Sequence, residues 1–162
     1  MKIAIISDIH DNLVNLNKFL NWIKKNKIES VICCGDITNN ETLNELAKFS
    51  GAIYMVSGNI KLFDDEHVPQ HKNIKYFDKI GIFEIENKII GLCHEPFYID
   101  KILKEKKCDI VFYGHTHRPW EDNKNNVKCI NPGTLSATFQ RATFAVWNTK
   151  TEIIELKILD IL

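Results

Sequence analysis

Five short apolar runs in this chain each end in residues whose side chains are common metal ligands. Short runs rich in Ile and Val, bounded by Gly, Asp or Asn, are typical of buried β-strands. The residues that follow the runs at 3–7, 31–34, 53–57, 89–93 and 110–113 are, in order, Asp8-Ile9-His10, Gly35-Asp36, Gly58-Asn59, His94 and Gly114-His115-Thr116-His117. Because strand ends at one edge of a sheet converge, these side chains are expected to share one site.

Helical patterns separate the first three of these runs. Apolar residues recur at helical spacing over residues 13–23, behind a cap offered by Asp11 and Asn12. A second helical pattern covers residues 39–49 and is stopped by Gly51. An alternation of strand and helix predicts parallel strands joined by crossover helices.

The rest of the chain has a different order of elements. The patterns predict a loop over 61–72, a hairpin over 80–92 divided at Asn87, a short helix over 97–107, a polar turn over 121–126, a strand over 127–130 and a terminal hairpin over 142–159 divided at 148–150. We expect one domain over residues 1–162, with two packed sheets flanked by helices.

Charge and cysteine content narrow the functional classes. Lys plus Arg and Asp plus Glu both total 21, so the chain lacks the basic excess with which proteins grip nucleic acid. Five cysteines, without any CxxC pair, favour free thiols in a reducing compartment, which we expect to be the cytoplasm. Asp8, His10 and Asp11 interrupt the first apolar run too early for a signal peptide, and no run reaches membrane-spanning length.

The combination of ligands is more informative than any single fragment. An Asp-x-His or a Gly-Asp pair alone is most often a polar strand end or a turn. Together, four of the six histidines join two aspartates and one asparagine at strand ends, which gives seven N and O ligands suited to Mn, Fe, Zn or Ni. Seven ligands exceed the need of one ion and suit two. The other histidines, His67 and His71, lie in the polar loop and are interpreted as solvated.

The ordered set of motifs resembles the signature of the calcineurin-like metallophosphoesterases. The segments Ser7-Asp8-Ile9-His10-Asp11-Asn12 and Asn131-Pro132-Gly133-Thr134 make the chain most similar to the small YfcE-like phosphodiesterases. The resemblance spans nearly the whole chain. It implies an α/β fold, a four-layer α/β/β/α sandwich of two mixed sheets flanked by helices, with a dinuclear metal site at the edge of the sheets.

The resemblance also implies roles for individual residues. One metal ion would be held by Asp8, His10, Asp36 and His117, and the other by Asp36, Asn59, His94 and His115, with Asp36 bridging. Asp36, Asn59 and His94 would be catalytic, and a hydroxide bridging the ions would attack phosphorus. The expected cofactors are two divalent ions, foremost manganese, with iron, zinc and nickel as alternatives. Asn12, Lys61 and Arg141 are candidate substrate contacts, against the simpler interpretation of solvated surface side chains.

Three positions depart from the family pattern. Ile60 stands where many members carry a histidine that assists the leaving group, Lys61 where related chains tend to have aspartate, and Glu95 where glycine is common. Without an obvious proton donor, the enzyme is expected to prefer diesters with good leaving groups or to rely on the metal ions alone.

The implied activity is hydrolysis of small or nucleotide-like phosphodiesters. The alternatives are a phosphomonoesterase on the same site, a non-catalytic scaffold resembling the retromer small subunit, and a nuclease. The filled ligand set argues against the scaffold, and the balanced charge argues against the nuclease. The oligomeric state stays open, with a homodimer among the alternatives, and no membrane partner is expected.

Overall fold

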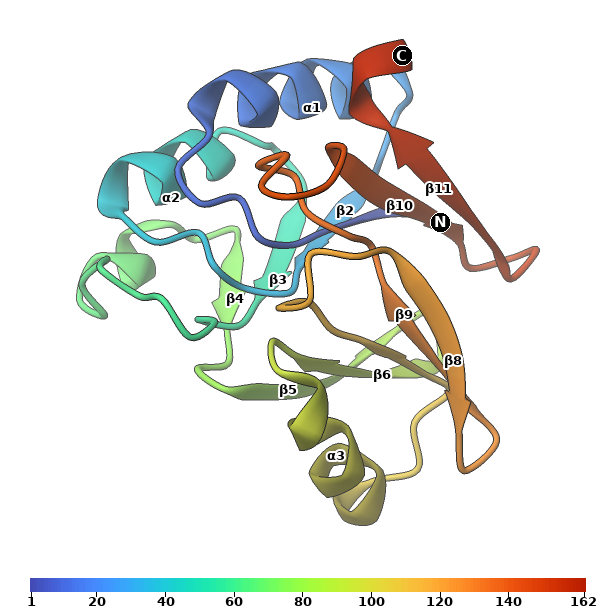
Figure 1. Ribbon diagram of the computed structural model, residues 1–162. Coiled ribbons are helices and arrows are strands. Elements are labelled where there is room, and N and C mark those ends of the chain that lie inside the picture. The colour runs from blue at the N-terminus through green and yellow to red at the C-terminus, as the bar shows by residue number, and fades with distance from the viewer.

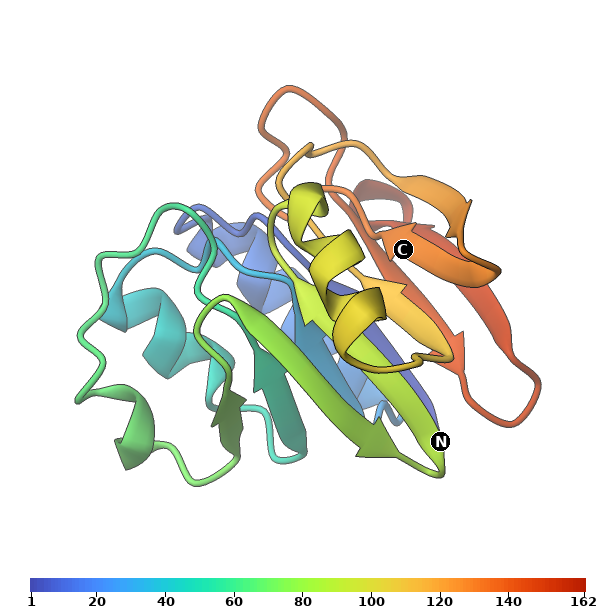
Figure 2. The same cartoon turned by 90° about the horizontal axis from the view of Figure 1, so that it is seen from below.

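The computed structural model describes residues 1–162 and contains two β-sheets packed face to face. In Figure 1, the helices α1 (Leu13–Lys25) and α2 (Asn40–Leu46) lie above the first sheet, and α3 (Ile99–Glu105) lies below the second. Figure 2 shows the same layers from below, with α3 nearest to the viewer. This order of layers confirms the predicted four-layer sandwich.

The first sheet has six strands in the order β11-β10-β1-β2-β3-β4. Their bounds are β1 (Lys2–Ile6), β2 (Ser30–Cys33), β3 (Ala52–Met55), β4 (Ile74–Tyr76), β10 (Thr143–Asn148) and β11 (Ile153–Ile158). β1, β2 and β3 run parallel, as the alternation of strand and helix predicts, β4 adds a fourth parallel strand, and the terminal hairpin β10–β11 joins antiparallel to β1. The carboxyl ends of β1, β2 and β3 therefore meet at one edge.

The second sheet has five strands in the order β5-β6-β7-β9-β8. Their bounds are β5 (Ile80–Ile85), β6 (Lys88–Cys93), β7 (Ile110–Phe112), β8 (Trp120–Lys124) and β9 (Val127–Asn131). β6, β7 and β9 are parallel, and β5 and β8 are antiparallel edge strands. Three short 3-10 turns, at Val68–Gln70, Pro96–Tyr98 and Leu159–Ile161, complete the elements.

Alternate residues of the central strands face different layers. In β1, Ile3 and Ile5 pack in the cluster between the two sheets, and Ala4 and Ile6 pack in the cluster beneath α1 and α2. Both faces are therefore buried, which explains why the central strands are continuously apolar instead of alternating. A smaller cluster fixes α3 to the second sheet.

The helix cap predicted from the sequence forms at Asn12. Its side chain accepts a hydrogen bond from the backbone N–H of Asn15, which satisfies one free donor at the start of α1. Asn39 caps α2 in the same way through the N–H of Thr42. α2 ends at Leu46, five residues before Gly51, so the predicted second helix is too long.

Two strands differ from the expectation. Residues 121–126 were expected to be a turn, but β8 occupies Trp120–Lys124 and pairs antiparallel with β9. β8 is an edge strand that is exposed on almost all its residues, so its sequence lacks the apolar face by which a strand is recognised. The turn is confined to Asn125 and Asn126, both with positive φ. β4, a three-residue edge strand, was also not predicted.

None of the helices has the length and apolar character needed to span a bilayer.

Candidate metal centre

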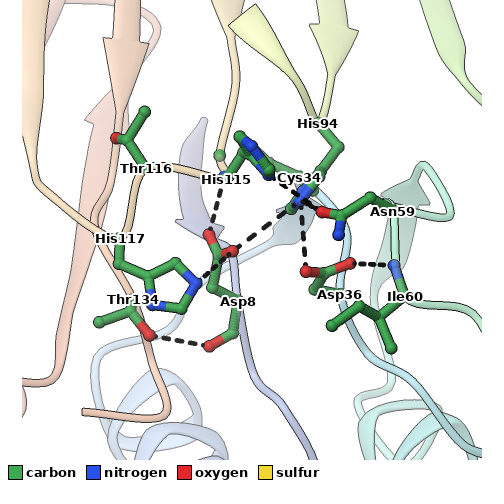
Figure 3. Close-up of polar contacts among 12 residues, drawn as sticks. Asp8, Cys34, Asp36, Asn59, Ile60, His94, His115, Thr116, His117 and Thr134 are labelled. Atoms are coloured by element: carbon green, nitrogen blue, oxygen red, sulfur yellow. Dashed lines mark hydrogen bonds and ion pairs between the residues drawn. The ribbon is translucent and has the colours of Figure 1, made fainter. Parts of the chain in front are cut away.

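The seven candidate ligands come together at the ends of five strands, and Figure 3 labels all of them except His10. The first sheet contributes Asp8 and His10 after β1, Asp36 after β2 and Asn59 after β3, and the second sheet contributes His94 after β6 and His115 and His117 after β7. The site therefore lies where the edges of both sheets meet, and each sheet supplies part of it.

Five of these ligands have a left-handed backbone conformation. The φ angles are 54° at Asp8, 43° at His10, 56° at Asp36, 71° at His115 and 59° at His117. This conformation is uncommon for residues other than glycine and costs about 1–2 kcal/mol each. Backbone hydrogen bonds hold it in place: the N–H of Asp8 donates to Gly35 O at 3.1 Å, and the N–H of Asp36 donates to Ser57 O at 3.2 Å.

Two glycines allow the ligand-bearing turns to approach one another. Gly58 has φ +87°, and a Cβ there would lie 2.2 Å from Oδ1 of Asp36. A Cβ on Gly114 would lie 1.9 Å from Oγ of Ser7 and 3.0 Å from Oδ2 of Asp8. Glycine is required at both positions because a larger residue would displace a ligand carboxylate.

The first group of ligand atoms consists of Asp8, His10 and His117. Nε2 of His117 lies 3.2 Å from Oδ1 of Asp8, and Nε2 of His10 lies 3.1 Å from Nε2 of His117. Asp8 is completely buried, and its Oδ1 has no hydrogen-bond partner. Its other oxygen accepts the backbone N–H of His115 at 3.1 Å. A buried carboxylate oxygen without a donor is costly unless a cation balances it.

The second group joins Asp36, Asn59 and His94. Nε2 of His94 lies 2.7 Å from Oδ1 of Asn59 and 3.3 Å from Oδ2 of Asp36. The other oxygen of Asp36 accepts the backbone N–H of Ile60 at 2.9 Å. His115 also faces Oδ1 of Asn59, through its Nδ1 at 3.0 Å.

Backbone carbonyls determine the tautomers of two histidines. Nδ1 of His94 lies 2.8 Å from Cys34 O, and Nδ1 of His117 lies 3.2 Å from Thr138 O. A carbonyl can only accept, so each Nδ1 carries a proton, and the neutral form of each ring presents its Nε2 lone pair to the site. These lone pairs point at carboxylate and amide oxygens that are also acceptors. The arrangement fits divalent cations, with the orienting hydrogen bonds typical of metal-bound histidines.

Both carboxylates lie between the two groups. Oδ2 of Asp36 is 3.7 Å from Nε2 of His10 and 3.3 Å from Nε2 of His94. Oδ1 of Asp8 is 3.2 Å from Nε2 of His117 and 4.0 Å from Nε2 of His94. The two carboxylates thus form the shared floor of the site.

The candidate ligands become more exposed from this floor toward the mouth of the site. Asp8, Asp36 and His94 are buried, with exposed fractions of 0%, 2% and 1%. His10 and His117 are partly exposed, and Asn59 and His115 are exposed. The exposed ligands are therefore those that a bound substrate would meet.

The carboxylates and imidazoles shift one another's pKa values. Burial lowers the pKa of His94, but the hydrogen bond and charge of Asp36 outweigh it and leave the pKa raised. Burial raises the pKa of Asp36, but contact with His94 outweighs it and leaves that pKa lowered. The interaction with Asp8 raises the pKa of His10 despite burial. Without ions, the two carboxylates therefore stabilise the protonated forms of His10 and His94.

The predicted substrate contacts are not all available. The Lys61 ammonium forms an ion pair with Asp65 and lies 5.3 Å from the centre of the Phe63 ring, so its charge is directed at its own loop. The Asn12 side chain already makes two hydrogen bonds within the fold. Its Oδ1 accepts from the N–H of Asn15, and its Nδ2 donates to Ser136 O at 2.9 Å. Arg141 is exposed and has no ion pair.

The other two positions that depart from the family pattern, Ile60 and Glu95, have distinct settings. Ile60 places its backbone N–H on Asp36, and its side chain is 43% exposed. Glu95 has one buried carboxylate oxygen, Oε2, without a hydrogen-bond partner. Neither side chain offers a proton donor directed at Asp36, Asn59 or His94.

The sequence interpretation missed the residues that support the ligands. Oγ1 of Thr134 donates to Asp8 O at 2.9 Å, and Nδ2 of Asn131 donates to Gly114 O at 2.8 Å. Both belong to the segment Asn131-Pro132-Gly133-Thr134, which was recognised as a motif without a role. The indication available in the sequence was a polar cluster directly after an apolar run.

His67 and His71 are not simply solvated. Their Nε2 atoms lie 2.8 Å and 2.9 Å from Oδ1 of Asn44, so both rings dock on α2.

Comparison with known proteins agrees with the geometry. Residues 1–152 match the calcineurin-like phosphoesterase superfamily domain. A phosphodiesterase of Methanocaldococcus jannaschii is 28% identical over 144 residues, which cover 82% of this chain and 83% of that protein.

Solved structures share the fold. An archaeal phosphodiesterase superimposes with a TM-score of 0.86 at 24% identity, over 98% of this chain and 99% of the other. Vps29 of Entamoeba histolytica, crystallised with zinc, has a TM-score of 0.72 at 17% identity, over 98% of this chain and 99% of the other.

These matches confirm the predicted fold class and the prediction of a phosphoric ester hydrolase. The match over residues 1–152 includes all seven candidate ligands. The chain belongs to the calcineurin-like phosphoesterase superfamily.

Proposed function

We propose that the chain is a dinuclear metal-dependent phosphodiesterase that hydrolyses small or nucleotide-like phosphodiesters, with manganese as its foremost ion. The observation that carries this proposal is the cluster of inward-facing acceptor atoms on Asp8, Asp36, Asn59, His94 and His117. Such a cluster requires cations, and its mixture of N and O ligands suits Mn, Fe, Zn or Ni. The named phosphodiesterase among the relatives supports the choice of reaction.

Asp8, His10 and His117 would hold one ion and Asn59, His94 and His115 the other, with Asp36 between them. Two divalent ions bound here would lower the pKa of a water molecule and supply positive charge to the reacting phosphoryl group.

Backbone groups of the chain orient the ligand side chains. Cys34 O and Thr138 O fix the rings of His94 and His117, and the backbone N–H groups of His115 and Ile60 fix the two carboxylates. Asn59 uses its Oδ1 toward the histidines, which leaves its amide N–H groups to donate to a phosphoryl oxygen. Because Asn59 is exposed, this donation is open to substrate.

The alternative functions make different demands on the site. A phosphomonoesterase would use the same ligands, and only substrate choice separates it from a diesterase. A scaffold would have no use for buried, unpaired acceptors such as Oδ1 of Asp8, since these destabilise the protein unless an ion is bound.

The test is a metal-reconstituted activity screen. Chelator-treated protein is reloaded with Mn²⁺ and assayed on an activated aryl diester, an unactivated diester, a cyclic nucleotide and a monoester. We expect hydrolysis of diesters only in the loaded protein, with the activated diester fastest because Ile60 provides no proton donor. Hydrolysis of the monoester alone would assign a phosphomonoesterase, and no hydrolysis of any substrate would favour the scaffold.

A further inference from the structure

Two exposed apolar residues closely follow candidate ligands in the sequence, and a third lies in the loop between β9 and β10. Ile60 follows Asn59 and is 43% exposed, and Phe97 follows His94 by three residues and is 67% exposed. Phe139 is 89% exposed, the highest value among the large apolar residues. An apolar side chain left in water beside a polar ion site is a candidate contact for the apolar part of a ligand.

Phe139 is the member of this set that lies against a ligand histidine. The centres of the Phe139 and His117 rings are 6.1 Å apart, with an angle of 35° between their planes. The preceding residue, Thr138, provides the carbonyl that accepts the Nδ1–H of His117. The phenyl ring is therefore next to the first ion group, on the solvent side of it.

The backbone at Phe139 is strained. Its φ is +62°, and Ala137 in the same loop has φ +67°. A bulky residue in this conformation is an outlier, and strained positions cluster at functional sites. Glycine or asparagine would fit this backbone conformation better than phenylalanine. Neither the turn nor the core therefore explains why a phenylalanine stands at this position.

The loop that carries Phe139 is firmly anchored. The N–H groups of Leu135 and Ser136 donate to Ser7 O at 2.9 Å and to Asp8 O at 3.1 Å. Oγ of Ser136 donates to Oγ1 of Thr138 at 2.7 Å, and Asn12 binds Ser136 O. Figure 2 shows this loop, between β9 and β10, projecting beyond the sheets. The ring is thus presented from a fixed base, which lowers the entropy lost when a ligand packs on it.

We propose that Phe139 forms a binding subsite for a flat, apolar ester substituent, an aryl group or a nucleobase, while the adjoining centre binds the phosphoryl group. This assignment rests on the proposed function. A phenyl face carries no net charge and binds planar rings by stacking, so it adds affinity for aromatic esters without competing for phosphate. Aromatic stacking of this kind corresponds to about a threefold to tenfold change in affinity.

The experiment compares binding of phenyl phosphate and methyl phosphate to the manganese-loaded protein by calorimetry. These probes share the phosphoryl group and differ only in the flat ring. We expect Phe139→Ala to weaken phenyl phosphate about threefold to tenfold and to leave methyl phosphate unchanged. Phe139→Tyr should restore the wild-type ratio, and the manganese content should be equal in all variants.

Phe97→Ala is the matched control, because Phe97 is also an exposed phenylalanine and lies three residues after His94. Its ring packs on Tyr98 instead, with 4.3 Å between the ring centres. Equal losses for both probes, no loss, or the same selective loss in Phe97→Ala would overturn the subsite. A wild-type dimer that Phe139→Ala converts to a monomer would overturn it too, because the ring would then belong to an interface. Wild-type protein that binds neither probe would instead reject the proposed function.

Discussion

At the scale of the residue, each of the two buried carboxylates contacts histidines of both ligand groups. Asp36 contacts Nε2 of both His10 and His94, and Asp8 approaches both His117 and His94. Removal of one imidazole is therefore expected to affect mainly one of the two ligand groups, whereas removal of either carboxylate is expected to affect both.

Asp36→Ala should therefore abolish activity and reduce the content of both ions, and His10→Ala should reduce mainly one. Metal analysis of dialysed protein gives the stoichiometry. Equal loss of a single ion in the two variants would contradict a bridging role for Asp36.

The pH dependence of the metal-free protein follows from the pKa shifts. The raised pKa values of His10 and His94 contribute stability below about pH 6.5, which is lost as the pH rises through the folded-state values. The lowered pKa of Asp36 contributes stability above its ordinary value of 3.8, which is lost as the pH falls through the folded-state value. Chelator-treated protein should therefore be most resistant to urea in mildly acid buffer. Asp36→Asn should flatten this profile, and an unchanged profile would contradict the pairing.

Gly58→Ala should disturb the site although it removes no ligand. The added Cβ would meet Oδ1 of Asp36 at 2.2 Å, and φ is +87°. We expect a loss of about 1–3 kcal/mol in stability, as for other strained backbone positions, together with weaker metal binding. Urea unfolding and metal titration measure the two effects, and a variant with normal affinity would show that the turn can relax.

At the scale of the element, the segment between β3 and β4 is less free than its polar sequence implies. His67 and His71 both bind Oδ1 of Asn44 on α2, and Asp64 exchanges hydrogen bonds with Asn40. These contacts hold the loop that begins just after Asn59 against the helix.

Asn44→Ala should release both rings and expose this loop. We expect faster cleavage by a nonspecific protease within residues 61–72 and a loss of about 1 kcal/mol in stability, with unchanged metal content. Asn21→Ala, on the exposed face of α1, is the control. Equal cleavage rates in the two variants would show that the contacts with Asn44 do not order the loop.

The central strands that the sequence predicts are buried, whereas the strands that were not predicted are exposed or very short. β1, β2 and β7 are apolar because both faces are covered, so short apolar runs locate them and the ligands at their ends. β8 has no buried residue, and β4 has only three residues. Their pairing with β9 and β3 is set by tertiary contacts that leave no local pattern. The left-handed φ values at Asp8 and His10 were equally hidden, because Asp and His tolerate this conformation more readily than most residues but do not require it.

At the scale of the whole molecule, the site connects the two sheets. The first group, Asp8, His10 and His117, combines candidate ligands from both sheets, and so does the second, in which Asp36 and Asn59 follow strands of the first sheet and His94 a strand of the second. Bound ions would therefore link the layers that the apolar cluster between them already joins.

Reloading with Mn²⁺ should raise the unfolding temperature of chelator-treated protein. Binding to the native state alone adds about 2.7 kcal/mol when the free ion is at 100 times its dissociation constant. Scanning calorimetry of the wild type and of Asp36→Ala would show the effect in the former only. A similar rise in the variant would indicate that ions bind elsewhere.

The division of ligands between the sheets also has a consequence for biosynthesis. A ribosome synthesises the chain at about 5–20 residues per second. His117, from the second sheet, therefore emerges seconds after Asp8 and His10. β1 must wait longer still for β10, its antiparallel neighbour, so its apolar edge stays open until residues 143–148 have been synthesised. The nascent protein is therefore expected to acquire its ions only after the ligands of the second sheet have emerged.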